Sequence, residues 1–454
     1  MRHPESTCES QFQSRRGASV LITPAILDCE SPRGMTLRKF ISYSFAVICM
    51  IFMARATGGF LSGNDARDLS DDGGGESPAF AAACLVFYVI TGLWLLAHSN
   101  YLRRILSQQK LLLMFLFLCL MSTAWSILPS GTLVRAISLV GNCCIAFYLY
   151  YSFSKQELLR IFCAAFIVMG IGSVLIAVIN PSIGIMQGGD NSGNWRGLFI
   201  HKNPASYVFV IAAIFAWWGV NNDRAWRGAW LSLLLLSALL IVLTQSRTGF
   251  VALFFCAIFG CWLRFKSASK HSNKILADIS IMFAIAAGYW LFTNADIFLN
   301  VLGRDATLTG RTKIWSIAFD YLLDRPFLGY GYQASWRAPE AMPLQMVLAG
   351  WLYNPSQSHN SFIDIALGVG LVGGAVVCVW LARIMLLTMT RRILLADPLM
   401  RAFSLVNLSI IITGMSGRTV MQTNSIGTTL LVISSLYVAD CLRNGKNGPV
   451  SPEI

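Results

Sequence analysis

The sequence predicts an all-α, polytopic integral membrane protein with about twelve transmembrane helices and one large loop between the ninth and tenth. Of its 454 residues, 55% are apolar and 13% are charged, whereas roughly 25% of the residues in an ordinary soluble domain are charged. Apolar runs with the length of a membrane span, about 20 residues, recur along the chain. The run over 231–243 is uniformly apolar, whereas the strands of a membrane barrel alternate, so helices are expected.

The apolar runs define the elements in order. The predicted spans are 40–56, 79–98, 111–128, 132–151, 161–179, 204–220, 229–244, 249–264, 275–293, 361–387, 402–416 and 426–442. The predicted organisation is a cytoplasmic tail (1–38), spans one to nine (39–293), a large periplasmic loop with amphipathic helices (294–360), spans ten to twelve (361–442) and a cytoplasmic tail (443–454). Residues 1–34 are polar and lack an apolar signal region, and a natural start at Met35 follows them, so they are predicted to be dispensable.

The basic residues predict the orientation of the chain. If the N-terminus is cytoplasmic, 23 of the 35 lysines and arginines fall on the inner side, as the positive-inside rule requires. They occupy short flanks rather than one patch, which argues against a nucleic-acid partner for this chain of net charge +13. The other twelve lie at or beyond the outer surface: Arg55, Arg67, Arg135, Arg196, Lys202, Arg247, Arg304, Arg311, Lys313, Arg325, Arg337 and Arg418.

Two outer segments combine such cations with other polar groups. The first precedes the sixth span and contains Arg196, His201, Lys202 and Asn203. The second is the turn over 245–249, where Arg247 is held near the lipid headgroups between two apolar helices. A solvated loop is an equal alternative for the first, and an arginine reaching a lipid phosphate is an equal alternative for the second.

The large loop contains a predicted helix and a predicted turn. Arg311 precedes apolar residues at helical spacing, which predict an amphipathic helix lying along the membrane. These residues are Ile314, Ile317, Ala318, Tyr321 and Leu322. Pro326 ends the helix, and the glycines around Tyr330 indicate a turn, although they could equally be ordinary loop residues. A second apolar stretch, 341–353, is too short to span.

His359 and Asn360 lie at the outer start of the tenth span. Asn360 or Ser361 is expected to cap the helix. The positive helix end disfavours an imidazolium, so His359 would stay neutral and able to accept a proton; an incidental interfacial histidine is the alternative. The outer cations could converge outside the membrane, where arginine suits bidentate binding of phosphate. These cations are Arg196, Lys202, Arg247, Arg311 and Arg418.

The four segments together resemble the O-antigen ligase and Wzy-type polymerase superfamily of bacterial membrane glycosyltransferases. The resemblance covers about residues 130–390, and the form of the first segment is most similar to the exopolysaccharide-polymerase (ExoQ-type) branch. The matching motifs are Arg196-Gly197…His201-Lys202-Asn203, Ser246-Arg247-Thr248-Gly249, Gly310-Arg311…Trp315…Pro326…Gly329-Tyr330-Gly331 and His359-Asn360-Ser361.

The resemblance implies a GT-C-like fold and a metal-independent, inverting transfer without a cofactor, at the periplasmic face of the bacterial inner membrane. Arg247 and Arg311 would hold the diphosphate, and His359 would take the proton from the acceptor hydroxyl. Substrate contacts are expected from Arg196, His201, Lys202, Asn203, Asn360 and Arg418. The expected partners are an undecaprenyl-diphosphate-linked glycan donor, a glycan or lipid A core acceptor, membrane lipid and other polysaccharide-export components.

The sequence leaves other functions open. An O-antigen ligase would use the same base and cations but transfer the glycan to lipid A core, and the branch resemblance favours the polymerase. A metal-dependent glycosyltransferase would use the acidic residues of the first outer loop, Asp65, Asp68, Asp71, Asp72 and Glu76. A flippase for lipid-linked oligosaccharide would favour ionisable residues near the middle of the membrane, and the predicted spans have few.

Overall fold

The computed structural model describes residues 36–56, 78–188, 191–268, 309–348, 350 and 355–446. The chain divides into two compact units, Met1–Ser42 and Tyr43–Ile454, and every contact discussed below lies within the second. The described residues form helices joined by short connections, and the only β-type pairing recorded among them is an isolated bridge between Ile185 and Trp195.

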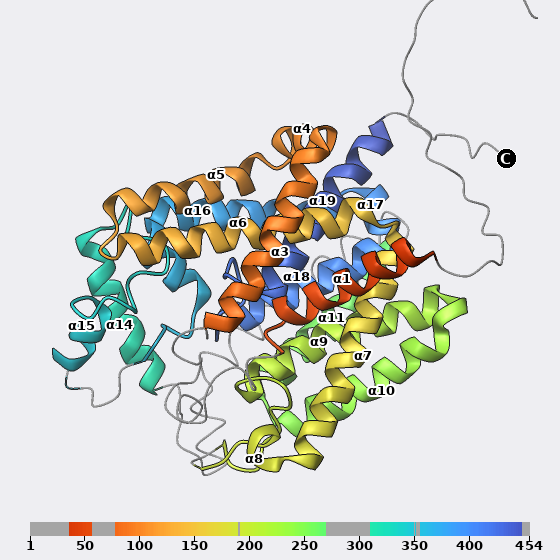
Figure 1. The fold of residues 1–454 in the computed structure, drawn as a ribbon, viewed down its shortest axis with the longest axis horizontal. Coiled ribbons are helices and arrows are strands. Elements are labelled where there is room, and N and C mark those ends of the chain that lie inside the picture. The colour runs from red at the N-terminus through yellow and green to blue at the C-terminus, as the bar shows by residue number, and fades with distance from the viewer. Residues whose placement is uncertain are drawn as a thin grey trace, which may run out of the picture. The chain divides into compact units, whose positions relative to one another are not determined.

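The helices follow the apolar runs of the sequence (Figure 1). In chain order they are α1 Leu37–Met53, α3 Pro78–Ala97, α4 Ser99–Gln108, α5 Lys110–Met121, η2 Ser122–Trp125, α6 Pro129–Ser152, α7 Lys155–Ile179, α8 Pro181–Gly184, α9 Lys202–Asn222, η4 Arg224–Trp226, α10 Arg227–Thr244, α11 Arg247–Ala268, α14 Thr309–Asp324, α15 Met342–Leu348, α16 Ser361–Thr390, α17 Arg392–Ala396, α18 Pro398–Gly414 and α19 Ile426–Lys446. Local signals set several starts: Ser154 and Glu157 form a capping box before α7, and proline begins α6 and α18.

Eight helices of the described part are long and apolar enough to cross a membrane. They are α3, α6, α7, α9, α10 with η4, α11, α16 and α19. A ninth candidate is the pair of α4 and α5 with η2, bent by 94°. The predicted spans 40–56 and 402–416 correspond to α1 and α18, which have 17 residues each, and the span 275–293 lies outside the described residues.

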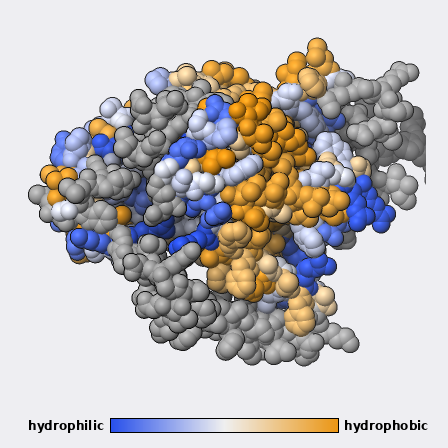
Figure 2. Space-filling model, turned by 90° about the horizontal axis from the view of Figure 1, so that it is seen from below, coloured by the Kyte–Doolittle hydropathy of each residue, from blue (hydrophilic) through white to orange (hydrophobic). Residues whose placement is uncertain are grey.

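The surface and the interior both fit a membrane protein. Large apolar side chains such as Leu93, Phe117 and Leu235 are more than half exposed, and a broad hydrophobic area covers part of the face shown in Figure 2. The interior is built around α9 and α19, because 72% of the apolar stretch of each is buried. The prediction of an all-α polytopic membrane protein is therefore confirmed.

Two groups of helices surround this interior. In Figure 1, α5, α6 and α16 run side by side, and α7, α9 and α10 form a second group; contacts between α5 and α6, α5 and α16, α9 and α10, and α7 and α10 agree with this view. Helix α18 contacts α9, α11, α16 and α19, so it joins the two groups. The described part of the large loop packs against α16 through its helix α14.

The helix predicted after Arg311 is present as α14, but its apolar face has a different partner from the one expected. Ile314, Ala318 and Leu322 are buried in a cluster with residues of α16, including Leu367. The sequence suggested that this face lies on the membrane. It packs on protein instead, because the first turns of α16 offer it a complementary apolar surface.

The predicted turn around Tyr330 docks into a break in α16. Val369 and Gly370 leave the helical conformation, and Gly370 has a φ of 70°. The freed carbonyl of Leu367 accepts a hydrogen bond from the Tyr330 amide at 2.9 Å, and the Gly368 carbonyl accepts one from the Gly331 amide at 2.8 Å. A Cβ on Gly370 would overlap the carbonyl of Phe327. These glycines therefore allow two backbones to approach closely.

Candidate active site

A cavity of about 150 Å³ lies where six helix ends meet. Its lining comes from the C-terminal ends of α1 and α18, the N-terminal ends of α9, α11 and α19, and the segment that leads into α16. Each of these ends is one that the positive-inside analysis assigns to the same, outer side. With Gln333 and Arg337 from the segment after α14, residues from six separated parts of the sequence therefore share one small space.

The cavity is polar and contains cations but no acidic side chain. In the described part of the chain, its ionisable lining residues are Arg55, His201, Arg337, His359 and Arg418. Neutral hydrogen-bonding side chains complete much of the wall: Asn203, Tyr207, Thr248, Gln333, Gln357, Thr413, Ser416, Thr419, Gln422, Thr423, Asn424 and Ser425. This lining favours a ligand that carries negative charge and many oxygen atoms.

His359 is presented to the cavity by a strained loop. Its φ is 57°, in the left-handed region, and it directly precedes Asn360, the N-cap of α16. The Asn360 side chain accepts hydrogen bonds from the amides of Phe362 (2.9 Å) and Ile363 (3.4 Å), as predicted for a cap. Asn360 is therefore engaged in the helix start and is not among the cavity-lining residues.

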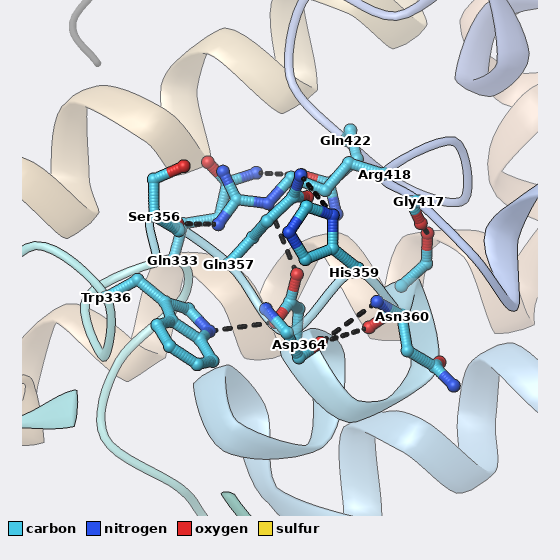
Figure 3. Close-up of polar contacts among 12 residues, drawn as sticks. Gln333, Trp336, Ser356, Gln357, His359, Asn360, Asp364, Gly417, Arg418 and Gln422 are labelled. Carbon is cyan, nitrogen blue, oxygen red and sulfur yellow. Dashed lines mark hydrogen bonds and ion pairs between the residues drawn. The ribbon is translucent and has the colours of Figure 1, made fainter. Parts of the chain in front are cut away.

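Gln357 is the hydrogen-bonding neighbour of the His359 ring (Figure 3). Gln357 Nε2 lies 3.3 Å from His359 Nδ1, and the donor and acceptor roles depend on the tautomer of the ring. Gln357 is 2% exposed, and its Oε1 has no hydrogen-bond partner in the described part of the chain. The hydrogen bond with Gln357 thus fixes the imidazole at Nδ1, and the ring lines the cavity.

Asp364 fixes the loop that carries His359. One carboxylate oxygen accepts from Trp336 Nε1 at 2.8 Å and from the Ser358 amide at 3.1 Å. The other accepts from Arg418 Nε at 3.2 Å, and Arg418 Nη2 donates to the Ser356 carbonyl at 2.6 Å (Figure 3). A nearly buried carboxylate with this many partners is a rigid anchor.

Two further contacts hold the same loop. Trp315 of α14 donates to the Ser358 carbonyl at 2.8 Å. Ser361 donates to the Gly417 carbonyl at 2.8 Å and accepts from the Thr419 amide at 3.0 Å. The outer loop and the connection between α18 and α19 therefore position the segment before α16 together.

Only some residues of the predicted motif before α9 line the cavity. Arg196 is 3% exposed and donates to the carbonyls of Ser182, Ile183 and Ile200, so it stabilises the turn in front of α9. It does not line the cavity. Its hydrogen bonds support a role in local structure, since a buried guanidinium is satisfied by the backbone around it. The predicted contact of Arg196 with substrate stays a prediction.

His201 and Asn203 do line the cavity. His201 is the N-cap of α9, and its Nδ1 accepts from the Asn203 amide at 3.2 Å. Asn203 Oδ1 accepts from the Ser246 hydroxyl at 2.9 Å, which joins the first predicted motif to the second. Lys202, between them, begins α9 and is not among the lining residues.

The two arginines predicted to hold a diphosphate are not among the residues that line the cavity. Arg247 is exposed at the first position of α11, and the next two residues, Thr248 and Gly249, do line the cavity. Within the described residues, the Arg247 side chain has no hydrogen bond or ion pair of its own. Arg311 is partly buried in the first turn of α14, one turn before Trp315.

Sequence reasoning missed several lining residues. Gln357, Gln333 and Gln422 are neutral amides, which carry no motif; Gln333 Nε2 donates to Gln422 Oε1 at 2.9 Å across two loops. Tyr207 is 7% exposed, and its hydroxyl has no partner among the described side chains and backbone groups. The distribution of basic residues could have identified Arg337, because Arg337 is one of the twelve predicted to lie at or beyond the outer surface.

No group of three or more His, Cys, Asp or Glu residues in the described ranges could hold a metal ion. The acidic residues considered for that role, between Asp65 and Glu76, lie outside the described residues.

Comparison with known proteins supports the interpretation of the motifs. Residues 231–378, which include Arg247, Arg311 and His359, match a family model described as O-antigen ligase (Wzy_C). The chain is also 26% identical over 301 residues to the Exopolysaccharide production protein ExoQ of Rhizobium meliloti (strain 1021). That alignment covers 62% of this chain and 66% of the relative, just under two thirds of its length. The expected resemblance to the O-antigen ligase and Wzy-type polymerase superfamily, on its exopolysaccharide side, is therefore confirmed.

Proposed function

We propose that this protein is a membrane glycosyltransferase that polymerises exopolysaccharide repeat units from an undecaprenyl-diphosphate-linked donor. The matched family and the relative support a membrane enzyme that processes polysaccharide. The finer proposal rests on one observation: His359 lines a cavity whose charged lining groups are cationic or imidazole in the described residues. That is the combination needed to accept a proton beside a negatively charged leaving group.

In the proposed reaction, the oxygen of an acceptor sugar hydroxyl forms a bond to the anomeric carbon of the donor glycan. The bond from that carbon to the diphosphate oxygen breaks, and the lipid diphosphate leaves with the electron pair. His359 takes the hydroxyl proton. One displacement inverts the anomeric configuration and needs no metal or cofactor in this scheme.

Gln357 completes the proposed base. The oxygen and nitrogen of a side-chain amide exchange places by a half-turn, and the choice between them is an assignment. If Gln357 is turned, its Oε1 accepts from Nδ1–H of His359, and Nε2 is then the unprotonated nitrogen of the ring. The amide nitrogen then occupies the buried position where the oxygen has no partner, and can donate to a substrate oxygen. This tautomer is the one that a base requires.

The leaving diphosphate would be stabilised by arginines of the predicted outer side. Arg247 is suited to this role because it is exposed, lies at the positive end of α11 and has no counter-ion among the described residues. We keep Arg311 in the same role on the basis of its motif. Arg55 and Arg337 are additional candidates from the lining. Arg418 is already paired with Asp364, so we assign it to positioning the loop of His359.

We further propose that the cavity opens at the periplasmic face of the inner membrane, in a GT-C-like fold with both termini cytoplasmic. The distribution of lysine and arginine supports this orientation. The meeting of six predicted outer helix ends at one cavity supports the same assignment. Other polysaccharide-export components remain proposed partners.

An O-antigen ligase is the second candidate, because the matched family carries that description. Ligase and polymerase differ in the acceptor, so the test is reconstitution of the purified full chain in liposomes with undecaprenyl-diphosphate-linked repeat units, with and without lipid A core. Polymer formed without lipid A core supports the polymerase. Glycan transferred only to lipid A core supports the ligase. Movement of labelled donor between leaflets without a new glycosidic bond contradicts both and supports a flippase.

A further inference from the structure

A second, larger cavity of about 540 Å³ lies between α9, α11 and α18. It shares no lining residue with the cavity of His359. Its wall is mostly apolar and includes Ile214, Trp217, Leu253, Cys256 and Leu405. Its volume falls in the range of about 300–1,000 Å³ that is typical of pockets for small molecules and cofactors.

The polar residues of this cavity gather at one end. Asn221 and Asn222 close α9, Arg264 lies in the last turns of α11, and Arg401 lies in the first turn of α18. Helices α9 and α11 run toward this end and α18 starts from it, so the four side chains share one level. That level is the predicted cytoplasmic side, opposite to the end of α9 that lines the first cavity.

Neither arginine forms an ion pair with a carboxylate in the described part of the chain, although Asp397 attracts Arg401 electrostatically from a longer distance. Arg401 Nη1 donates to Ser267 Oγ at 3.2 Å and to the carbonyls of Leu395 and Ala396 at 2.8 and 3.2 Å. These neutral acceptors orient its guanidinium without neutralising it. The neighbouring carboxylate, Asp397, is occupied by the amides that it caps and by the Tyr437 hydroxyl.

We propose that this cavity binds one anionic phospholipid from the inner leaflet. The phosphate would lie between Arg264 and Arg401, and an acyl chain would follow the apolar wall toward Leu253 and Leu405. Two like charges at the rim of one apolar cavity repel each other, and a shared anion removes that repulsion. Basic pockets between transmembrane helices on the cytoplasmic side characteristically bind anionic headgroups.

Trp217 supports the position proposed for the lipid headgroup. Trp217 is 55% exposed while it lines the cavity. Tryptophan is enriched where the hydrocarbon meets the headgroups. The proposed lipid would therefore enter sideways from the bilayer, and its binding is independent of the proposed glycosyl transfer.

The test is native mass spectrometry of the purified full chain, delipidated and titrated with phosphatidylglycerol or with phosphatidylethanolamine of the same acyl chains. We expect one tightly bound phosphatidylglycerol, at least tenfold tighter than phosphatidylethanolamine. Arg264→Gln with Arg401→Gln should weaken phosphatidylglycerol binding at least tenfold. The matched control is Arg224→Gln with Arg227→Gln, which removes two exposed charges from the same predicted side outside the cavity and should change binding less than twofold.

If Arg401→Gln does not fold, two single variants still test the proposal. Arg264→Gln touches an exposed side chain, and Gly260→Leu fills the wall, where a Cβ meets the methyl groups of Leu405 at 3.4 and 3.6 Å. Each variant should weaken the binding of phosphatidylglycerol. Gly260→Leu should also weaken the binding of phosphatidylethanolamine. Equal binding of the two lipids, or no effect of these variants, overturns the proposal. So does the absence of any bound lipid.

Discussion

At the scale of single residues, side chains of the same type have different roles in and around the cavity. His359 lines the cavity with its ring held by Gln357, whereas His201 caps α9. Arg418 is paired with a carboxylate, and Arg247 has no such partner among the described residues. The sequence singled out His359, His201 and Arg247 through motifs and Arg418 through its outer position. It did not predict their partners, because pairs such as Arg418 and Asp364 come from segments far apart in the chain.

The first prediction concerns the base. His359→Ala should lower polymer or ligated glycan by about 10²–10⁴-fold, the usual contribution of a general base, while the protein still inserts. Product is measured by gel and mass analysis of reconstituted reactions. The control is His98→Ala, an exposed histidine at the predicted cytoplasmic side. Near-normal product from His359→Ala would remove the residue from the mechanism.

The second prediction concerns Gln357. Gln357→Glu places a carboxylate beside Nδ1 of His359, which stabilises the protonated imidazole. Because the protonated ring cannot act as a base, the acidic limb of the pH–rate profile should move to higher pH. Gln187→Glu, in an outer turn, should leave the limb where it is. If His359→Ala abolishes activity but Gln357→Glu does not move the limb, the orienting role of Gln357 is wrong.

The third prediction concerns the diphosphate. Arg247→Ala and Arg311→Ala should each lower kcat/KM by at least tenfold, because each removes a cation from the leaving group. Arg247→Lys should recover part of the loss, since charge returns without the bidentate geometry. Arg227→Ala, an exposed arginine at the opposite predicted side, serves as the control. Wild-type kinetics in Arg247→Ala would exclude that residue as a diphosphate ligand.

At the scale of elements, the apolar runs predicted the long described helices, because helix length and hydrophobicity are local properties of the chain. The short helices α4, α8 and α17 were not predicted. Packing partners were less predictable. The apolar face of α14 was identified correctly by its spacing, yet its partner is α16 and not lipid. The break in α16 was also not predicted, because glycine in a membrane helix usually signals close packing of continuous helices.

The fourth prediction tests that break. Gly370→Ala should prevent the loop around Tyr330 from docking, because the new Cβ overlaps the Phe327 carbonyl at a φ of 70°. We expect a fall of several degrees in the melting temperature and loss of activity. Gly374→Ala, on the same helix, meets no atom within 4 Å and should behave like the wild type. The measurement is thermal unfolding in detergent together with product formation.

At the scale of the whole molecule, the sequence divided its positive charge into an inner majority and an outer minority. The helix ends agree with that division, since those assigned to the outer side meet at one cavity and those assigned to the inner side carry the arginines of the other. The sequence could not show which outer cations line the site. That depends on how helices distant in the sequence pack, as the absence of Arg196 from the lining illustrates.

The fifth prediction concerns an ion pair between Arg160 of α7 and Asp223, the residue that follows α9. Burial opposes ionisation of Asp223, but hydrogen bonds from Arg160 and Trp230 outweigh it and lower the pKa of Asp223. A lowered pKa in the folded state stabilises the fold above the unfolded pKa, about 3.9. That contribution is lost as the pH falls through the folded value.

Asp223→Asn should therefore lower the melting temperature by a few degrees at neutral pH. The difference from the wild type should shrink as the pH falls below about 4, where the wild-type carboxylate also becomes neutral. Asp320→Asn, an exposed carboxylate on α14, is the control and should have little effect. A difference that stays constant down to acidic pH would mean that the carboxylate charge does not contribute.

The break at Gly370 also divides α16 into two parts with different contacts. The residues before it are tied to the outer loop through Tyr330, Gly331 and the anchor at Asp364. Those after it form a second helical rod that continues to Thr390. Within one uninterrupted helix, each added or removed residue would turn His359 by about 100° around the axis. Because the helical conformation is interrupted at Gly370, the orientation of the first part of α16, which His359 precedes, is set by its contacts with the loop around Tyr330.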